Sequence, residues 1–404
     1  MPKEFTITLA VASDLHCHDD AKATPVESYL LAGALRNPVG QHPVQSLIEL
    51  LKGKALKANA LICPGDLSNR ICSKGMMQAW DHLREIGREL KCQQLLTTLG
   101  NHDVDCLKKH DADSFKIPQS LHPDFPILID SEKDCFWSRG FYFSLDSSCG
   151  ADFVVLNTVV THNNEPSAKR GTFEHHHIEG LRAALAQRKM DIYDKMDVPH
   201  RIAVMHHHPI IHSFVDHGSG DVLQFGDQIL SVLAEYGFHL VIHGHRHFPR
   251  ITRHNSGGVE QMIFAAGSFS AYLQKLSSVT RNLFHIISLT TQSSGLPLTG
   301  QIRSWEYNYG LGWRPSTAQS ASLPHLAGFK VPVQNIDLNR LCHQCDIAPG
   351  AQLRAEEILA AFPELQMMLP AELTLVQSEL LKLGYKLIIS PTGSIEVCGR
   401  ISSM

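Results

Sequence analysis

Short stretches of alternating apolar and polar residues recur along the chain, separated by longer segments with helical periodicity. In the first stretch, Phe5, Ile7, Leu9 and Val11 are apolar and threonines lie between them, as in a half-buried strand. The pattern predicts strands at residues 5–12, 59–63, 94–98, 152–159, 201–205, 238–242, 261–266 and 283–290. It predicts helices near residues 43–58, 76–91, 177–189, 224–236, 352–361 and 372–383. Because strands and helices alternate, we expect an α/β fold with a layered sheet.

The composition changes after about residue 290. The segments TTQSSGLPLTGQ and RPSTAQSASLP are rich in Ser, Thr, Pro and Gly, which is typical of loops and linkers. Beyond them, the stretch KLIISPTGSIEV has two β-rich runs around a Pro-Thr-Gly turn, which predicts a hairpin. We therefore expect a main domain over residues 1–310 and a small α+β domain over residues 326–404. That small domain could cap a cleft, mediate self-association or bind a partner.

Composition and charge narrow the class of protein. Hydrophobic residues make up 43% of the chain and charged residues 19%, which is typical of a globular protein with a full core. The net charge of −4 gives no general attraction to nucleic acid or to an anionic membrane. No apolar run approaches the roughly 18 residues that span a bilayer, and the first residues do not resemble a signal peptide. We expect a soluble cytoplasmic protein whose ten cysteines are mostly reduced and buried.

Five short polar motifs each follow a predicted strand. They are Asp14-Leu15-His16, Gly65-Asp66, Gly100-Asn101-His102-Asp103, His206-His207-His208-Pro209 and Gly244-His245-Arg246-His247. In open α/β sheets, ligands bind beyond the carboxyl ends of the strands, so we expect the five motifs to converge at one edge of the sheet. Their glycines permit tight turns and close approach of the backbone.

The side chains in these motifs favour a pair of metal ions. Imidazole, carboxylate and amide groups are metal ligands. Two divalent metals about 3.5–4 Å apart can clamp the attacking and leaving oxygens of a phosphoryl displacement. Such a pair requires a bridging ligand, and Asp66 suits that role because a carboxylate has two oxygens. A ligand set rich in nitrogen favours Mn, Fe or Zn over Mg and Ca.

The order DLH, GD, GNHD, MHHHP and GHRH resembles the calcineurin-like metallophosphoesterase family, over roughly residues 5–290. The resemblance implies a β-sandwich core flanked by helices and makes residues 1–310 the catalytic domain. It implies that one metal is held by Asp14, His16 and His247, and the other by Asn101, His206 and His245. It also implies that His102 donates a proton to the leaving group and that Asp103 steers it.

Several assignments stay open at this point. The ligand in the histidine run is His206, with His207 and His208 as the alternatives near the substrate or behind the ligands. Arg70 and Arg246 either contact a substrate phosphate or are ordinary surface residues. The run from His175 to His177 either packs on the core or lines the cleft. Cys342 and Cys345 have half of a zinc-site spacing, with no second half.

Departures from subfamily patterns narrow the expected reaction. Asn69 occupies the position where purple acid phosphatases have a tyrosine ligand, so a tyrosinate-bound ferric site is not expected. The motifs look more like those of the bacterial cyclic-nucleotide and glycerophosphodiester phosphodiesterases than those of the protein phosphatases. We expect hydrolysis of a phosphodiester, in a nucleotide or another small molecule. The alternatives are a nuclease acting on DNA or RNA, and a non-catalytic scaffold with the same fold.

Overall fold

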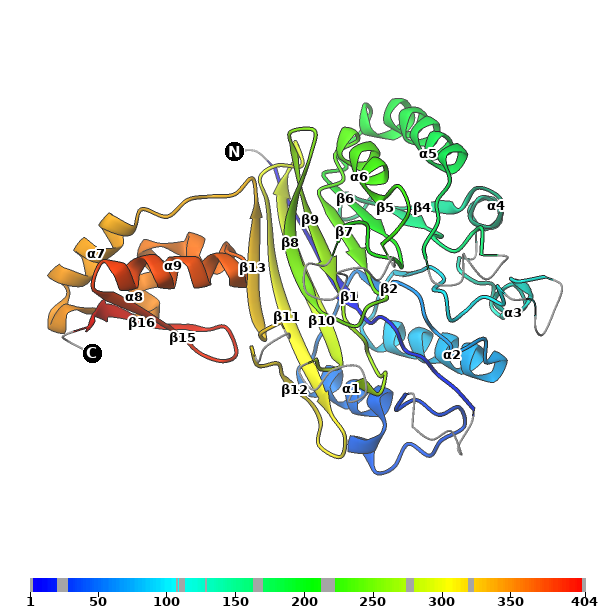
Figure 1. The fold of residues 1–404 in the computed structure, drawn as a ribbon, viewed down its shortest axis with the longest axis horizontal. Coiled ribbons are helices and arrows are strands. Elements are labelled where there is room, and N and C mark those ends of the chain that lie inside the picture. The colour runs from blue at the N-terminus through cyan, green and yellow to red at the C-terminus, as the bar shows by residue number, and fades with distance from the viewer. Residues whose placement is uncertain are drawn as a thin grey trace.

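Strand β1 (Glu4–Val11) lies inside a seven-stranded sheet and leads directly into the first motif. The computed structural model describes residues 3–19, 28–106, 108, 113–127, 129–162, 170–211, 222–273, 280–318 and 323–401. Within these residues, two sheets pack face to face and helices cover their outer faces (Figure 1). The predicted α/β class and the sandwich core flanked by helices are both confirmed.

The first sheet has the strand order β12-β11-β10-β1-β2-β3, and β13 pairs with β11. Its other strands are β2 (Ala60–Cys63), β3 (Gln94–Thr97), β10 (Leu283–Gln292), β11 (Leu298–Asn308), β12 (Gly312–Pro315) and β13 (Leu326–Val331). Strands β1, β2 and β3 are parallel, so their carboxyl ends lie at the same edge. Helices α1 (Pro43–Gly53) and α2 (Ser73–Glu89) pack against this sheet through their apolar faces.

The second sheet has the order β4-β5-β6-β7-β9-β8. Its strands are β4 (Phe141–Asp146), β5 (Ala151–Leu156), β6 (His200–Val204), β7 (Leu240–His243), β8 (Arg250–Ser256) and β9 (Val259–Ala265). Strands β5, β6, β7 and β9 are parallel. Along the chain, α3 (Lys116–Gln119) and α4 (Asp130–Arg139) precede β4, α5 (His175–Arg188) follows β5, and α6 (Gly226–Glu235) follows β6. No helix among the residues described is both long and apolar enough to cross a membrane.

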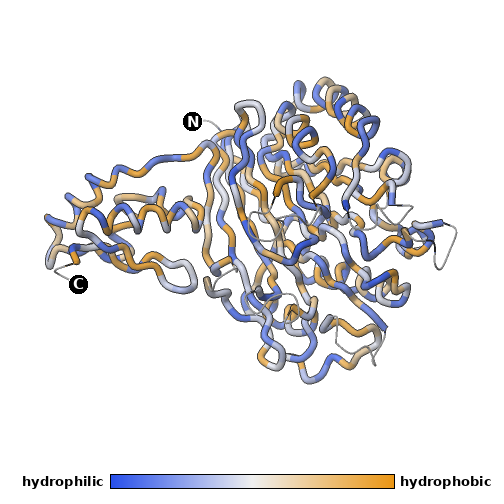
Figure 2. The backbone as a smooth tube through the Cα atoms, in the orientation of Figure 1, coloured by the Kyte–Doolittle hydropathy of each residue, from blue (hydrophilic) through white to orange (hydrophobic). Residues whose placement is uncertain are grey.

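Two hydrophobic clusters hold these layers together. The larger one joins the facing sides of both sheets, with Val11 and Ile62 from the first sheet and Phe153, Ile242 and Phe264 from the second. The smaller one lies between the second sheet and helices α5 and α6. Hydrophobic residues accordingly gather on the strands at the centre of the molecule (Figure 2). This core fixes the two sheets relative to each other and therefore fixes the loops at their ends.

Residues beyond β13 form a lobe that projects from the edge of the first sheet (Figure 1). It consists of α7 (Leu338–Ile347), β14 (Gln352–Arg354), α8 (Ala355–Ala361), α9 (Pro370–Lys382), β15 (Tyr385–Ile389) and β16 (Ile395–Arg400). Strands β15 and β16 form the hairpin that the sequence predicted. The lobe has a hydrophobic cluster of its own, which includes Leu341, Phe362 and Leu380. That a separate domain with its own role lies here stays a prediction.

The expectation that residues 291–325 form a linker is wrong for most of this range. Strands β11 and β12 lie in this range and extend the first sheet, and β13 follows them. Residues on β11 alternate between buried and more exposed positions, as in a strand with one covered face. Polar residues on the other face, and Gly300 and Ser304 at buried positions, made the composition resemble that of a loop. Residues 319–322 lie outside the described part of the chain.

Candidate metal centre

The loops that follow β1, β2, β3, β6 and β7 meet in space. Asp14 and His16 after β1 lie close to His247 after β7, and Asp66 after β2 lies close to His206 after β6. Strands β1, β2 and β3 belong to one sheet, and β6 and β7 belong to the other. The motifs therefore converge as predicted, but at the facing edges of two sheets and not at the edge of one.

Asp14, His16 and His247 form the first group of predicted ligands. The Nε2 atoms of His16 and His247 are 2.9 Å apart. Asp14 Oδ1 lies 3.3 Å from Nε2 of His247 and 3.9 Å from Nε2 of His16. The backbone N–H of His245 and the hydroxyl of Ser13 both donate to the Asp14 carboxylate and hold it in place. The three ligand atoms can therefore contact one ion.

Asn101, His206 and His245 form the second group. Asn101 Oδ1 lies 3.3 Å from Nε2 of His206 and 3.1 Å from Nδ1 of His245. The rings of His206 and His245 have their centroids 5.1 Å apart. An amide oxygen and two imidazole nitrogens therefore face a common point, as a transition-metal site requires.

The carboxylate of Asp66 lies between the two groups. Its Oδ2 atom is 3.6 Å from Nε2 of His16 in the first group and 3.4 Å from Nε2 of His206 in the second. Its Oδ1 atom accepts a hydrogen bond of 2.9 Å from the backbone N–H of His102. The Asp66 carboxylate thus lies within 3.6 Å of a ligand atom from each group.

The protonation of His206 tests whether these residues fit a cation. Its Nδ1 donates to the carbonyl of Pro64 at 2.7 Å, so in the neutral ring Nε2 carries a lone pair. That lone pair would face two further acceptors, Asp66 Oδ2 and Asn101 Oδ1. Burial lowers the pKa of His206, but the charges of Asp66 and Asp14 and the hydrogen bonds to Asp66 and Pro64 together outweigh burial and raise the pKa to about 9. A divalent cation between these atoms would replace that proton, because metal ligands bind deprotonated. The residues therefore fit a metal pair.

Burial keeps the neighbouring imidazoles in their ligand form. It lowers the pKa of His16 and of His245 well below the usual value, so both rings are neutral near pH 7. The charge of His206 and other nearby histidines lowers the pKa of His245 further. Neutral imidazole is the form that binds metals.

The backbone at the site is strained. Five of the seven predicted ligands have positive φ although none is glycine: Asp14 (54°), His16 (48°), Asp66 (52°), His245 (80°) and His247 (58°). Such a conformation costs roughly 1–3 kcal/mol per residue and is concentrated at functional sites. The flanking glycines allow the approach: a Cβ on Gly100 would lie 2.0 Å from Asp66 Oδ1, and one on Gly244 would lie 2.4 Å from Asp14 Oδ2.

The comparison with known families agrees with this geometry. The sequence model of the calcineurin-like phosphoesterase family matches residues 7–249, which is more than half of the chain. The chain belongs to the calcineurin-like phosphoesterase family. A search of curated proteins found no match. The matched residues contain all five motifs.

Solved structures of similar fold share little sequence with this chain. A predicted phosphoesterase from Streptococcus pneumoniae is 11% identical, with 80% of this chain and 98% of that chain covered and a TM-score of 0.31. Vacuolar protein sorting 29 from Cryptosporidium parvum is 9% identical, with 81% of this chain and 99% of that chain covered and a TM-score of 0.32. Phosphopantetheinyl hydrolase from Mycobacterium tuberculosis is 14% identical, with 65% of this chain and 89% of that chain covered and a TM-score of 0.32. Scores this low carry no argument about activity.

His102 is positioned differently from what the resemblance implied. Its Nδ1 lies 3.1 Å from Oδ1 of Asn69, which follows the Gly65-Asp66 motif. Asp103 instead accepts hydrogen bonds from the backbone N–H groups of Leu67, Ser68 and Gly100. The expectation that Asp103 steers His102 is therefore wrong for this structure. Asp103 fastens the two motif loops to each other, and Asn69 orients the imidazole. Sequence reasoning considered Asn69 only as a missing tyrosine.

His207 is a residue at the site whose role the sequence left open. Its ring centroid lies 4.4 Å from that of His245, and its Nδ1 lies 2.8 Å from Oγ1 of Thr158. Its nitrogen atoms come within 4.8 Å of the ligand atoms of His206 and His245. Since His206 faces Asp66 and Asn101, the geometry favours His206 as the ligand and places His207 behind it. A Cβ on Gly171 would lie 2.3 Å from Cγ of His207, so only glycine leaves room for this ring.

The two arginines proposed to contact phosphate lie on the motif loops. Arg70 is exposed, and its backbone nitrogen lies 3.4 Å from Nδ1 of His102. Arg246 lies between the two predicted ligands His245 and His247. Contact with a phosphate stays a prediction for both.

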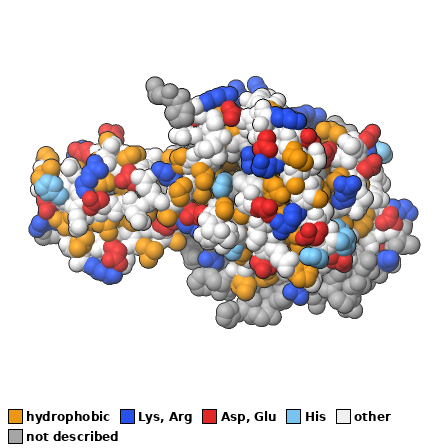
Figure 3. All heavy atoms as spheres, turned by 90° about the horizontal axis from the view of Figure 1, so that it is seen from above, with side chains coloured by type: hydrophobic (Ala, Val, Ile, Leu, Met, Phe, Trp, Pro, Cys, Tyr) orange, Lys and Arg blue, Asp and Glu red, His pale blue; other side chains and the backbone are white. Residues whose placement is uncertain are grey.

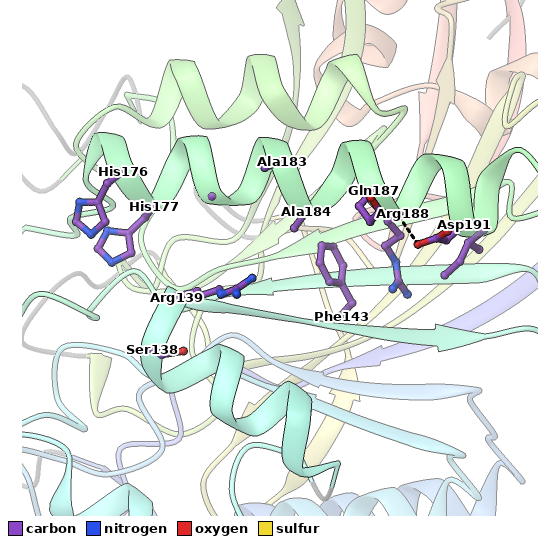
Figure 4. Close-up of a pocket in the computed structure, with 12 residues that line it drawn as sticks. Ser138, Arg139, Phe143, His176, His177, Ala183, Ala184, Gln187, Arg188 and Asp191 are labelled. Atoms are coloured by element: carbon purple, nitrogen blue, oxygen red, sulfur yellow. Dashed lines mark hydrogen bonds between the residues drawn. The ribbon is translucent and has the colours of Figure 1, made fainter.

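The second histidine run, from His175 to His177, lies at the start of α5 and lines a different hollow (Figure 4). His177 is buried and its ring packs 5.2 Å from that of Phe173. His176 and His177 border a cavity of about 620 Å³ between α4, β4 and α5, together with Arg139 and Phe143. This run is thus partly structural, as expected, and none of the residues that line its cavity is a predicted metal ligand.

The cysteines of α7 lie in the C-terminal lobe. Cys345 donates through Sγ to the carbonyl of Cys398 at 3.4 Å, and the described cysteines are all reduced. The groups of described residues whose ligand atoms lie within 4.8 Å of one another include neither Cys342 nor Cys345.

Proposed function

We propose that the protein is a two-metal phosphoesterase that hydrolyses a phosphodiester, in a nucleotide or another small molecule. The observation that carries the proposal is the position of Asp66, whose carboxylate lies within 3.6 Å of one histidine from each group of predicted ligands. A shared carboxylate between two sets of ligands is the arrangement that a metal pair requires.

The predicted ligands form two groups that share one carboxylate. Asp14, His16 and His247 would hold one ion and Asn101, His206 and His245 the other, with Asp66 shared. When bound, the two ions would orient the attacking and leaving oxygens and offset the charge that grows on the phosphoryl oxygens. Manganese, iron and zinc suit these ligands best.

His102 is the proposed proton donor to the leaving oxygen. The imidazole lies beside the predicted ligands, with its ring centroid 4.7 Å from that of His16. Because Nδ1 is directed at Asn69, Nε2 is the atom that exchanges the proton. A positioned general acid contributes about 10²–10⁴-fold to the rate.

A diester substrate fits this arrangement better than a monoester. Protonation of the leaving group matters most for an unactivated diester, whose alkoxide departs with difficulty. The GNHD and GHRH forms also resemble those of the family's phosphodiesterases. The cytoplasmic location and the small-molecule substrate stay predictions.

Two alternatives share the fold. A nuclease would be favoured by a basic face, but Lys and Arg are interspersed with Asp and Glu over the face shown in Figure 3. A non-catalytic scaffold would not require a full set of ligands and a proton donor. The presence of all eight side chains at the site favours an enzyme.

The test is a comparison of substrates in the presence of Mn²⁺, Fe²⁺ or Zn²⁺. We expect kcat/KM for bis(p-nitrophenyl) phosphate to exceed that for p-nitrophenyl phosphate, with cyclic nucleotides cleaved faster than oligonucleotides. A preference of about tenfold or more for the monoester with every metal, worth ~1.4 kcal/mol in the transition state, would overturn the diester assignment. Faster cleavage of oligonucleotides would favour the nuclease, and no turnover of any substrate would favour the scaffold.

A further inference from the structure

A cavity of about 590 Å³ lies between the outer face of the first sheet and the C-terminal lobe. Its floor is formed by β10, β11 and β13, with Gln301 and Arg303 of β11 directed toward it. The lobe contributes an apolar roof that includes Leu359, Leu365 and Leu373. None of the residues that line this cavity is a predicted metal ligand.

Arg303 is the one charged residue among the described residues that line this cavity. Its guanidinium stacks over the ring of Trp305, 5.7 Å from the centroid. No described carboxylate lies within ion-pair distance of it. Two other partly buried arginines do have acidic partners: Arg188 pairs with Asp152, and Arg253 with Glu260 and Glu372. Arg303 therefore holds a partly desolvated positive charge without an acidic partner among the residues described.

Such a charge is costly unless an anion compensates it. A guanidinium matches the planar or tetrahedral oxygens of carboxylate, sulfonate and phosphate groups through paired N–H donors. The leucines opposite it would cover an apolar body of the same molecule. Small-molecule sites commonly combine an apolar wall with a few polar groups that fix orientation.

We propose that this cavity is a binding site for a small amphiphilic anion, with its acidic head group on Arg303 and its apolar body against the leucines of the lobe. A molecule bound there touches both the sheet and the lobe. It therefore strengthens an association that the described residues otherwise make through contacts such as the ion pair between Arg253 of β8 and Glu372 of α9.

The test uses 1-octanesulfonate as the probe, because a phosphoesterase does not hydrolyse a sulfonate, and the result is independent of the proposed activity. Isothermal titration calorimetry on the full chain, below the concentration at which micelles form, compares wild type with Arg303→Gln. The matched control is Arg314→Gln, an exposed arginine on the neighbouring strand β12. A second titration uses n-octyl glucoside, which has the same apolar chain as the sulfonate but carries no charge.

We expect one site per chain for the sulfonate, weakened about tenfold or more by Arg303→Gln and unchanged by Arg314→Gln. Octyl glucoside should bind more weakly than the sulfonate. If Arg303→Gln does not fold, Leu373→Trp keeps the arginine and fills the apolar side of the cavity, and it should weaken binding. Equal affinity in wild type and the cavity variant that folds, or no binding to wild type up to about 5 mM, overturns the proposal.

Discussion

Oδ1 of Asn69 lies 3.1 Å from Nδ1 of His102, and this contact gives the imidazole its orientation at the metal centre. Asn69→Ala removes the acceptor and allows the ring to rotate. A lost hydrogen bond of this kind costs about 1 kcal/mol, so we expect turnover to fall about five- to tenfold. The measurement is kcat for an alkyl phosphodiester in Asn69→Ala, in His102→Ala and in the double variant. If Asn69 acts through His102, the loss in the Asn69→Ala, His102→Ala double variant equals that in His102→Ala alone. Additive losses would show that Asn69 has another role.

His102→Ala should lower turnover by about 10²–10⁴-fold for a substrate with an alkoxide leaving group. The loss should be much smaller for a p-nitrophenyl ester, whose leaving group departs without a proton. Metal content should stay close to that of wild type, because His102 is not among the proposed ligands. Rates on both classes of ester, with metal analysis of the same samples, check this. An equal loss on the two classes contradicts the role of proton donor.

The C-terminal lobe should be removable without loss of the metal centre. A cut after Gln334 keeps β13, which pairs with β11 and completes the edge of the first sheet. We expect a soluble product with the wild-type metal content. Its melting temperature should fall, because the ion pair of Arg253 with Glu372 and the packing of Leu369 on the main core are lost. A cut near residue 320 also removes β13 and serves as the comparison. An insoluble product that binds no metal after the cut at 334 would show that the lobe completes the main core.

His285 should make the fold sensitive to acid. Its Nε2 donates to the carbonyl of Ala266 and its Nδ1 pairs with the hydroxyl of Ser304, in a fully buried position on β10. Burial lowers the pKa of this imidazole to about 4, whereas an unfolded histidine titrates near 6.5. Below pH 6.5 the unfolded chain binds a proton that the folded ring does not take up. Stability is therefore lost as the pH falls from about 6.5 to 4, by up to about 3 kcal/mol for this group.

The check is the free energy of unfolding at several pH values for wild type and His285→Gln. Glutamine retains hydrogen bonding but does not titrate. The variant should start from a lower stability at pH 7 and lose less of it on acidification. Parallel pH profiles for the two proteins would mean that His285 titrates normally.

Much of the fold was predictable because the central strands are strongly apolar. Strands β1, β2, β3, β6 and β7 lie within about one or two residues of the predicted ranges, since both of their faces are largely buried. Strand β11 was missed because its outer face carries polar residues and its covered face includes a glycine. Strand β8 was missed for a similar reason, with Arg250, Arg253 and His254 among its residues. In β11 the polar composition concealed a period of two, whereas the positions of β8 do not alternate in burial.

The candidate site was predictable at the level of its motifs and not of their contacts. Each ligand follows a strand within a few residues, so topology alone brings the motifs together. The contact of Asn69 with His102 depends on the conformation of the loop after Asp66, where Arg70 and Ile71 have positive φ. The place of His207 depends on a glycine at position 171, more than 30 residues away in the chain. Neither relationship leaves a local pattern in the sequence.

The central claim is that Asp66 is shared by two metal ions. The most direct measurement is the metal content per chain, by elemental analysis after saturation with Mn²⁺ or Zn²⁺ and gel filtration, for wild type and for Asp66→Ala. The control is Asp81→Ala, which also removes one negative charge from the protein but lies on the exposed side of α2, away from the site. The account predicts two ions per chain in wild type and in Asp81→Ala, and fewer than one in Asp66→Ala. One ion per chain in saturated wild type, or two ions in Asp66→Ala, would contradict it.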